Sequence, residues 1–166
     1  MADFMSTQPL TSEDPSTTGS GEKFEEFVTA NEPRLRRAFV AAYGGERGRE
    51  ATAEALAYAW EYWPRISLMT NAAGYLYRVG QSRTRQRRAT LQFDPPRGVE
   101  SAFEPGLIPA LKRLTANQRA AVVLIHGYGW TFREVADLTG IKVTTVQNHL
   151  ERGLKKLRND LDGGNK

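Results

Sequence analysis

The chain of 166 residues has no cysteine and only two histidines. The absence of cysteine excludes disulfides and thiolate-ligated metal sites, which fits a protein of a reducing cytoplasm. No run approaches the ~20 consecutive apolar residues that span a bilayer, and the N-terminus lacks a basic start followed by an apolar run. We therefore expect a cytoplasmic protein with no membrane segment and no secretory signal.

Residues that carry out catalysis are equally sparse. His126 and His149 have no second metal-ligating residue nearby in the sequence, so no metal site is expected. The sequence has no glycine-rich phosphate loop, no paired-carboxylate motif and no nucleophile set. We expect a protein that is not an enzyme and that takes no cofactor and no small-molecule substrate.

Basic residues are missing from segment 1–22, which carries Asp3, Glu13, Asp14 and Glu22. The whole chain has a net charge of +4, so the rest of the chain, without these four negative charges, holds +8. The segment is rich in Ser and Thr, and we expect it to be disordered. A solubilising leader is the favoured interpretation, and an acidic arm that screens a basic surface is the alternative.

Apolar residues recur at helical spacing in two blocks, and strand patterns are weak throughout. Between the blocks, segment 89–105 contains three Pro and no helical stripe, which predicts a flexible linker. The expected fold class is therefore all-α: two small helical bundles, the second a helix-turn-helix domain of the winged-helix-like kind. The predicted units are a disordered tail over 1–22, a first bundle over 23–88, the linker, a second bundle over 106–160 and a tail over 161–166.

Several helix boundaries follow from Pro, Gly and capping residues. Pro33 predicts a break or kink near Asn31 in the first apolar stripe, which ends at Gly44. Pro64 is expected to terminate the second helix, and Thr115 to cap a helix that runs to His126. The remaining predictions are helices over 49–63, 72–88 and 107–114 and a loop over 65–71.

The segment 131–158, TFREVADLTGIKVTTVQNHLERGLKKLR, has the pattern of a helix-turn-helix. Thr131 and Glu134 form a capping box that starts a helix over 132–138. Gly140 suits the left-handed turn, and a second helix starts at Thr144 or Thr145. The small Ala136 and the apolar Val146 have the spacing that lets two such helices pack closely.

One face of this second helix is polar and basic, and it is the predicted DNA-contacting face. Amide side chains pair with adenine edges, Arg with guanine or phosphate, and basic residues further along position the helix on phosphates. His149 lies either on this face or at the edge of the buried stripe. The alternative is a solvated amphipathic hairpin without a ligand. The outward residues are Thr145, Gln147, Asn148, Glu151, Arg152 and Lys155, and the phosphate candidates are Lys155, Lys156 and Arg158.

A second basic segment closes the first block. From Ala72 to Arg88 there are five Arg and no acidic residue, with Tyr75 and Tyr77 among them. Such a helix suits a nucleic-acid backbone, with tyrosines for base stacking. The alternative is a solvated helix end, because cations stabilise helix C-termini, but this explains one or two arginines better than five.

In this order, the parts resemble a bacterial RNA polymerase sigma factor of the sigma-70 family, of the small extracytoplasmic-function type. The resemblance covers 24–158 and is strongest in region 4, LTANQRAAVVLIHGYGWTFREVADLTGIKVTTVQNHLERGLKKLR. In region 2 it rests on FEEFVTANEPRLRRAFVAAYGG, EALAYAWEYW and AAGYLYRVGQSRTRQRR. It implies a protein that binds core RNA polymerase and promoter DNA, with an anti-sigma protein as a further candidate partner.

The resemblance also implies roles for particular residues. Region 4 would read the minus-35 element, and region 2, with its loop 67–71, the minus-10 element. The minus-35 set is Thr131, Arg133, Thr144, Thr145, Gln147, Asn148, His149, Glu151, Arg152 and Lys155. The minus-10 set is Tyr75, Arg78, Gln81, Ser82, Arg83 and Arg85. The polymerase-binding set is Glu50, Ala53, Glu54, Ala57 and Trp60.

Region 2 departs from the family pattern at three positions. Ala53 stands where a Gln is usual, Ser82 where an Asn is common and Gly80 where an Ala is common. These departures favour the alternative function, a helix-turn-helix DNA-binding regulator that does not itself initiate transcription. The aromatic residues Trp60, Tyr62 and Trp63 could form a polymerase contact, but we expect them to pack in the core.

Overall fold

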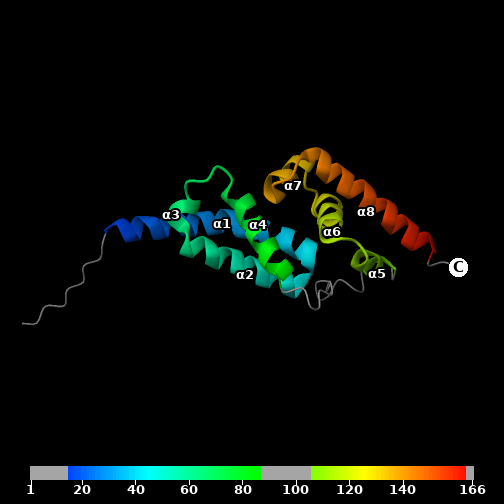
Figure 1. The fold of residues 1–166 in the computed structure, drawn as a ribbon, viewed down its shortest axis with the longest axis horizontal. Coiled ribbons are helices and arrows are strands. Elements are labelled where there is room, and N and C mark those ends of the chain that lie inside the picture. Colours follow the sequence, from blue (N-terminus) through cyan, green and yellow to red (C-terminus); the bar gives the residue numbers. More distant parts are fainter. Residues whose placement is uncertain (1–14, 87–105, 164–166) are drawn as a thin grey trace, which may run out of the picture.

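The computed structural model describes residues 15–86 and 106–163, and this part of the chain is helical without strands (Figure 1). The predicted all-α fold class is confirmed. Four helices, α1 to α4, form the N-terminal bundle, and α5 to α8 form the C-terminal bundle. The predicted linker 89–105 lies outside the described residues, as do the ends of the chain. No helix among the described residues is both long and apolar enough to cross a bilayer.

The first helix is longer than predicted. Helix α1 (Pro15–Tyr43) starts inside the segment predicted to be disordered and continues through Pro33, so of the predicted break or kink near Asn31 the break is wrong. A Pro in a helix interior costs about 3 kcal/mol. Burial offsets this cost, because Phe27 packs on Trp63 with ring centroids 5.1 Å apart and Leu35 is fully buried.

The chain reverses sharply between α1 and α2 (Gly45–Glu61). Gly44 has a φ of 90°, a conformation open to glycine, so α2 begins four positions before the predicted Arg49. The two helices then approach closely: a Cβ on Gly48 would lie 2.5 Å from the backbone N and Cα of Val40. This glycine therefore sets the spacing of the N-terminal bundle.

A short helix occupies part of the predicted loop 65–71. Helix α3 (Trp63–Ile66) carries Pro64 in its first turn. Backbone N–H groups in a first turn have no acceptor within the helix, so the N–H that Pro lacks costs no hydrogen bond there. The chain then turns through 67–71 into α4 (Ala72–Gln86). Pro64 therefore lies in the first turn of a new helix, which begins directly after α2 ends.

The C-terminal bundle starts with α5 (Leu107–Lys112) and α6 (Ala116–Val122). Thr115 caps α6 as predicted: its Oγ1 accepts from the Gln118 N–H at 3.3 Å, and its N–H donates to Gln118 Oε1 at 3.2 Å. The helix predicted to run to His126 changes after Val122 into a π-helical turn, η2 (Val123–Gly127). Helices α7 (Phe132–Thr139) and α8 (Val143–Gly163) complete the bundle.

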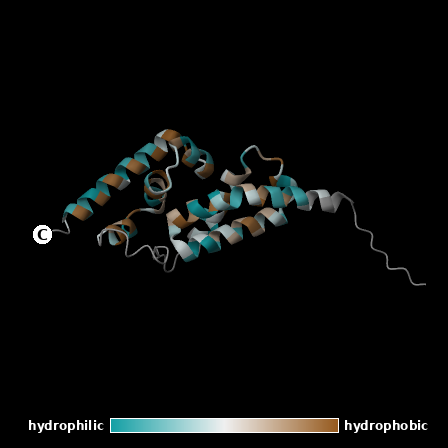
Figure 2. Ribbon diagram, turned by 180° about the vertical axis from the view of Figure 1, so that it is seen from behind, coloured by the Kyte–Doolittle hydropathy of each residue, from teal (hydrophilic) through white to brown (hydrophobic). Residues whose placement is uncertain are grey.

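The two bundles pack against each other, which the sequence did not predict. Helix α1 contacts α6 and η2, and α4 contacts α7, so the buried apolar residues of both bundles form one continuous cluster. Helix α8 lies along the outside with alternating apolar and polar stripes (Figure 2). The polar stripe of α8 therefore remains open to solvent while the bundles are in contact.

Candidate nucleic-acid interface

The helix-turn-helix forms as its sequence predicts. The Thr131 Oγ1 accepts from the Glu134 N–H at 3.2 Å, and the Thr131 N–H donates to Glu134 Oε2 at 2.8 Å. These bonds hold the pKa of the Glu134 carboxyl below its usual value, because they favour the charged form. Gly140 ends α7 with a φ of 70°, the left-handed conformation expected at a helix C-terminus.

The second helix of the motif is fixed by its buried stripe. Val146 is fully buried, and Leu150 and Leu157 are nearly so. Gly153 lets α8 approach α6, since a Cβ there would lie 2.9 Å from a methyl group of Val122. This packing holds α8 in one orientation and leaves a single side of the helix outward.

Most of the predicted minus-35 residues share that outward side. Thr145 and His149 are half-buried, and the other eight are exposed. The exposed members are Thr131, Arg133, Thr144, Gln147, Asn148, Glu151, Arg152 and Lys155. Amide and guanidinium groups therefore stand together on α8 and at the start of α7, as major-groove readout requires.

His149 lies at the edge of this face. It lines an apolar pocket that includes Ala121, Val135 and Val146. Burial, with a smaller contribution from the nearby Arg152 guanidinium, holds the pKa of His149 below its usual value. The imidazole is thus neutral at pH 7 and adds no positive charge to the face.

Lysines at the end of α8 are not equivalent. Lys155 is exposed, whereas Lys156 Nζ donates to the Arg113 carbonyl at 2.6 Å and ties α8 to the end of α5. Arg113 also forms an ion pair with Asp160 at 3.3 Å. The predicted phosphate contacts Lys155, Lys156 and Arg158 are all exposed, and Lys156 also has a structural role through its bond to Arg113.

The predicted minus-10 residues of α4 differ in exposure and in their side-chain contacts more than the minus-35 residues do. Tyr75 is half-buried and its hydroxyl is 3.1 Å from that of Tyr58, while the Arg83 guanidinium lies 5.0 Å from the Tyr58 ring centre. Ser82 is exposed. For Arg85 the structure describes the helical backbone alone.

Two other members of this set lie against the C-terminal bundle. Gln81 Nε2 donates to Asn117 Oδ1 at 3.3 Å. The Arg78 guanidinium lies beside Gly140, although its side chain remains exposed. The sequence predicts that Gln81 and Arg78 lie on a helix that faces DNA. Contact with the C-terminal bundle occupies part of that face.

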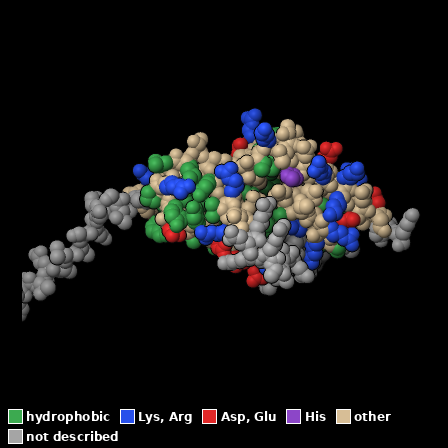
Figure 3. All heavy atoms as spheres, in the orientation of Figure 1, with side chains coloured by type: hydrophobic (Ala, Val, Ile, Leu, Met, Phe, Trp, Pro, Cys, Tyr) green, Lys and Arg blue, Asp and Glu red, His purple; other side chains and the backbone are tan. Residues whose placement is uncertain are grey.

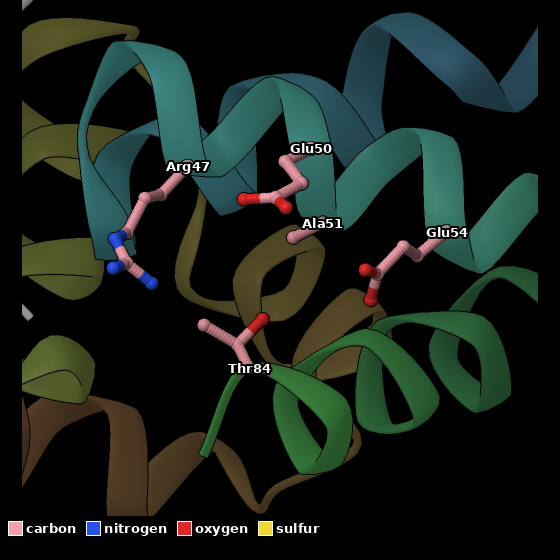
Figure 4. A pocket seen from close by; sticks show the side chains of 5 residues that line it. All are labelled: Arg47, Glu50, Ala51, Glu54 and Thr84. Carbon is pink, nitrogen blue, oxygen red and sulfur yellow. The ribbon is translucent and has the colours of Figure 1, made fainter. Parts of the chain in front are cut away.

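The predicted polymerase-binding residues follow one side of α2. Ala53, Ala57 and Glu50 are exposed and Glu54 is half-buried. Glu50 and Glu54 point toward α4, where they line a small pocket with Arg47, Ala51 and Thr84 (Figure 4). The pocket is formed by two helices of the same bundle, so the acidic residues stand at their junction.

The aromatic cluster is only partly in the core. Trp63 is buried as expected, but Trp60 is 61% exposed and Tyr62 is 40% exposed, so the prediction of core packing is wrong for these two. Leu68 is also highly exposed nearby in sequence. Hydrophobic side chains gather at this end of the N-terminal bundle, where Figure 1 places α3 (Figure 3). The ring of Phe24 contacts both Trp60 and Trp63, with centroid distances of 5.0 and 5.2 Å, so Trp60 packs on Phe24 at the surface while Trp63 is buried.

Sequence reasoning missed Arg119, the most buried charged residue among those described. It lies between the bundles and donates to backbone carbonyls on both sides. A single Arg in an amphipathic helix carries no sequence signal for such a position. Within residues 15–86 and 106–163, no group of three or more side chains could hold a metal ion.

Comparisons with known proteins agree with this geometry. The family model "Sigma-70, region 4" matches residues 107–157, which contain the helix-turn-helix. The RNA polymerase sigma factor CarQ of Myxococcus xanthus is 33% identical over 75 residues, which are 45% of this chain and 43% of CarQ. The chain thus matches less than half the length of that relative.

A solved structure with a similar fold is the sigma factor RpoE from Bartonella quintana, in complex with the anti-sigma factor NepR. The match has a TM-score of 0.56 at 18% identity and covers 85% of this chain and 98% of RpoE. It extends over both bundles, whereas the family model covers the C-terminal one. Residues 107–157 therefore match sigma-70 region 4, and the fold of the described residues is similar to that of a solved sigma factor.

Proposed function

We propose that this chain binds core RNA polymerase and directs it to promoters, with α8 reading the minus-35 element and α4 with loop 67–71 acting at the minus-10 element. The observation that carries this proposal is the capped helix-turn-helix, which exposes Gln147, Asn148 and Arg152 on one side of α8. Contacts to phosphate would come from Lys155 and Arg158.

The proposed polymerase contact is the exposed side of α2, from Glu50 through Ala53 and Ala57 to Trp60. Trp60 is 61% exposed, and a large exposed aromatic side chain is a surface that a partner would bury. An anti-sigma protein is a further candidate partner, supported by the similarity to RpoE, which was solved with NepR.

Transcription in vitro tests this proposal. Purified chain with core polymerase and a library of upstream sequences should give transcripts from a defined subset of promoters. Core polymerase alone is the control. Neither a stable complex nor promoter-dependent transcripts would mean that the chain does not act as an initiation factor.

A specific observation supports a second candidate, a DNA-binding regulator that does not initiate transcription. Ala53 and Ser82, which differ from the family pattern, are both exposed, so core packing does not account for them. Such a regulator would bind duplex DNA by itself with a steep salt dependence. DNA binding without any polymerase complex would favour this candidate.

Arg152→Ala should weaken binding to the preferred upstream sequence by about 1–3 kcal/mol, because a bidentate contact to a guanine would be lost. The measurement is fluorescence anisotropy with specific and scrambled duplexes. Arg36→Ala, an exposed Arg on α1, is the charge-matched control. An equal loss on both duplexes would assign Arg152 to phosphate, and unchanged binding would remove it from the DNA face.

A further inference from the structure

The junction between α5 and the second half of α8 carries an exposed Arg that lies outside the helix-turn-helix. Arg113 follows α5 directly, and its Nη1 lies 3.3 Å from Asp160 Oδ1 on α8. Its backbone carbonyl accepts from Lys156 Nζ at 2.6 Å. Figure 3 shows Lys and Arg side chains gathered over the part of the molecule where Figure 1 places α5 and α8. No residue predicted to contact DNA comes from α5 or its C-terminal end.

The ion pair that holds the Arg113 guanidinium is a weak one. The Arg113 side chain is 64% exposed, and an ion pair at such a surface contributes little to stability. The second carboxylate oxygen, Asp160 Oδ2, is buried and has no hydrogen-bond partner among the described residues, so the carboxylate is only half satisfied. An Arg binds a phosphate more favourably, because two parallel N–H groups donate to it. A phosphate can therefore replace the carboxylate of Asp160 at little cost.

Helix geometry places Arg113 about one groove width from the residues proposed to read bases. Arg152, Lys156 and Asp160 are spaced four residues apart, so they follow one stripe of α8 in steps of about 6 Å. The Arg113 guanidinium lies beside the last of them, about 12 Å along the helix from Arg152. The major groove of DNA is also about 12 Å wide, and phosphates border it. When Arg152 faces a base, Arg113 is therefore within reach of the backbone at the edge of the groove.

We infer that Arg113 is a DNA phosphate contact outside the helix-turn-helix, and that Asp160 holds its guanidinium until a phosphate takes the place of the carboxylate. This inference rests on the proposed binding of DNA by α8. It extends the DNA-contacting surface from the helix-turn-helix to the end of α5. Because a phosphate contact carries no base information, Arg113 strengthens binding to every sequence and leaves the choice of sequence to α8.

Equilibrium DNA binding by the full chain, measured over a series of salt concentrations, tests the phosphate contact. The probes are two fluorescein-labelled duplexes, one with the preferred upstream sequence and one with that sequence scrambled. Arg113→Ala should weaken binding several-fold, equally on both duplexes. It should also reduce the slope of log K against log salt by about 0.9, the value for one phosphate. Arg113→Lys keeps the positive charge and should restore most of that slope.

Asp160→Asn tests the exchange of carboxylate for phosphate. This variant should bind both duplexes several-fold more tightly than the unsubstituted chain, because the guanidinium no longer has to leave a carboxylate. In the Arg113→Ala background the same substitution should have a much smaller effect. Equal gains in the two backgrounds would mean that Asp160 only repels the DNA, and would overturn the exchange.

The N-terminal bundle provides a matched ion pair as the control. Arg36 and Glu32 on α1 lie 3.4 Å apart, and neither is predicted to contact DNA. Arg36→Ala and Glu32→Gln should leave the affinity and its salt dependence unchanged. Arg113→Ala keeps the backbone carbonyl to which Lys156 donates, so the connection between α5 and α8 should persist. Urea unfolding followed by circular dichroism checks that each variant is folded.

The outcomes separate this contact from the proposed function. If the unsubstituted chain prefers the specific duplex and Arg113→Ala leaves the salt slope unchanged, the phosphate contact fails and the proposed function stands. If the slope falls but the unsubstituted chain shows no preference between the duplexes, the contact stands and minus-35 reading fails. Weaker polymerase binding with unchanged DNA binding in Arg113→Ala would assign this surface to an acidic protein and overturn the inference. No DNA binding by the unsubstituted chain would overturn both.

Discussion

Gly48→Ala should destabilise the protein by about 3 kcal/mol or more, the upper part of the range for overpacking a core. The new Cβ would lie 2.5 Å from both the backbone N and the Cα of Val40. These are main-chain atoms of α1, so no rotamer change relieves the contact, and α1 and α2 must move apart. The buried residues of both helices, such as Ala41, Ala51 and Ala55, would lose packing with them.

Urea unfolding followed by circular dichroism measures this loss. Gly19→Ala is the matched control, because it makes the same substitution within α1 where nothing lies within 4 Å of the new Cβ. The higher helix propensity of Ala should leave that variant neutral or more stable by up to about 1 kcal/mol. If Gly48→Ala were as stable as Gly19→Ala, the close approach of α1 and α2 would be wrong.

Phe39→Ala should cost about 3–5 kcal/mol, as expected for removing a fully buried aromatic ring. Phe39 is completely buried, and its ring stacks on Tyr77 with centroids 4.8 Å apart. Tyr77 is itself fully buried, and burial raises the pKa of its hydroxyl. Removing the ring would leave a cavity between α1 and α4 and take away the support of Tyr77.

The same ring explains why Gly80 stands where relatives commonly have Ala. A Cβ on Gly80 would overlap the Phe39 ring, so Gly80→Ala alone should destabilise the chain by about 1–3 kcal/mol. In the Phe39→Ala background the added methyl enters the cavity, and Gly80→Ala should become neutral or stabilising.

A double-mutant cycle over these two positions, measured by the same urea unfolding, gives the interaction energy directly. Simple additivity of the two losses would contradict direct contact between Gly80 and Phe39. A favourable interaction energy would mean that Gly80, in place of Ala, makes room for the Phe39 ring of α1. The glycine would then have a packing reason and would not argue against a role for α4 at DNA.

The local signals in the sequence were read correctly because each acts over three or four residues. The Thr131–Glu134 box, the Thr115 cap and the left-handed Gly140 all depend on near neighbours. The outward face of α8 follows from the spacing of Val146, Leu150 and Leu157, and a regular helix converts that spacing into one buried side. These elements carry the region 4 match.

Features that depend on tertiary packing could not be predicted from such local patterns. Pro33 predicts a break, but the gain from packing on both sides of it keeps α1 continuous. Trp60 fits the apolar stripe of α2, yet it is 61% exposed and contacts the ring of Phe24 from α1 at the surface. Both outcomes depend on contacts with residues far away in the sequence, so the residues that flank Pro33 and Trp60 do not reveal them.

The sequence by itself determined that this chain is helical, that its last helices form a capped helix-turn-helix and that it resembles a sigma factor. Only the tertiary structure decided that the bundles pack against each other through Arg119 and Asn71. The physical reason is that helix caps and apolar stripes are encoded by neighbours in the chain. A guanidinium that caps a carbonyl 77 residues away depends on where two helices meet in space.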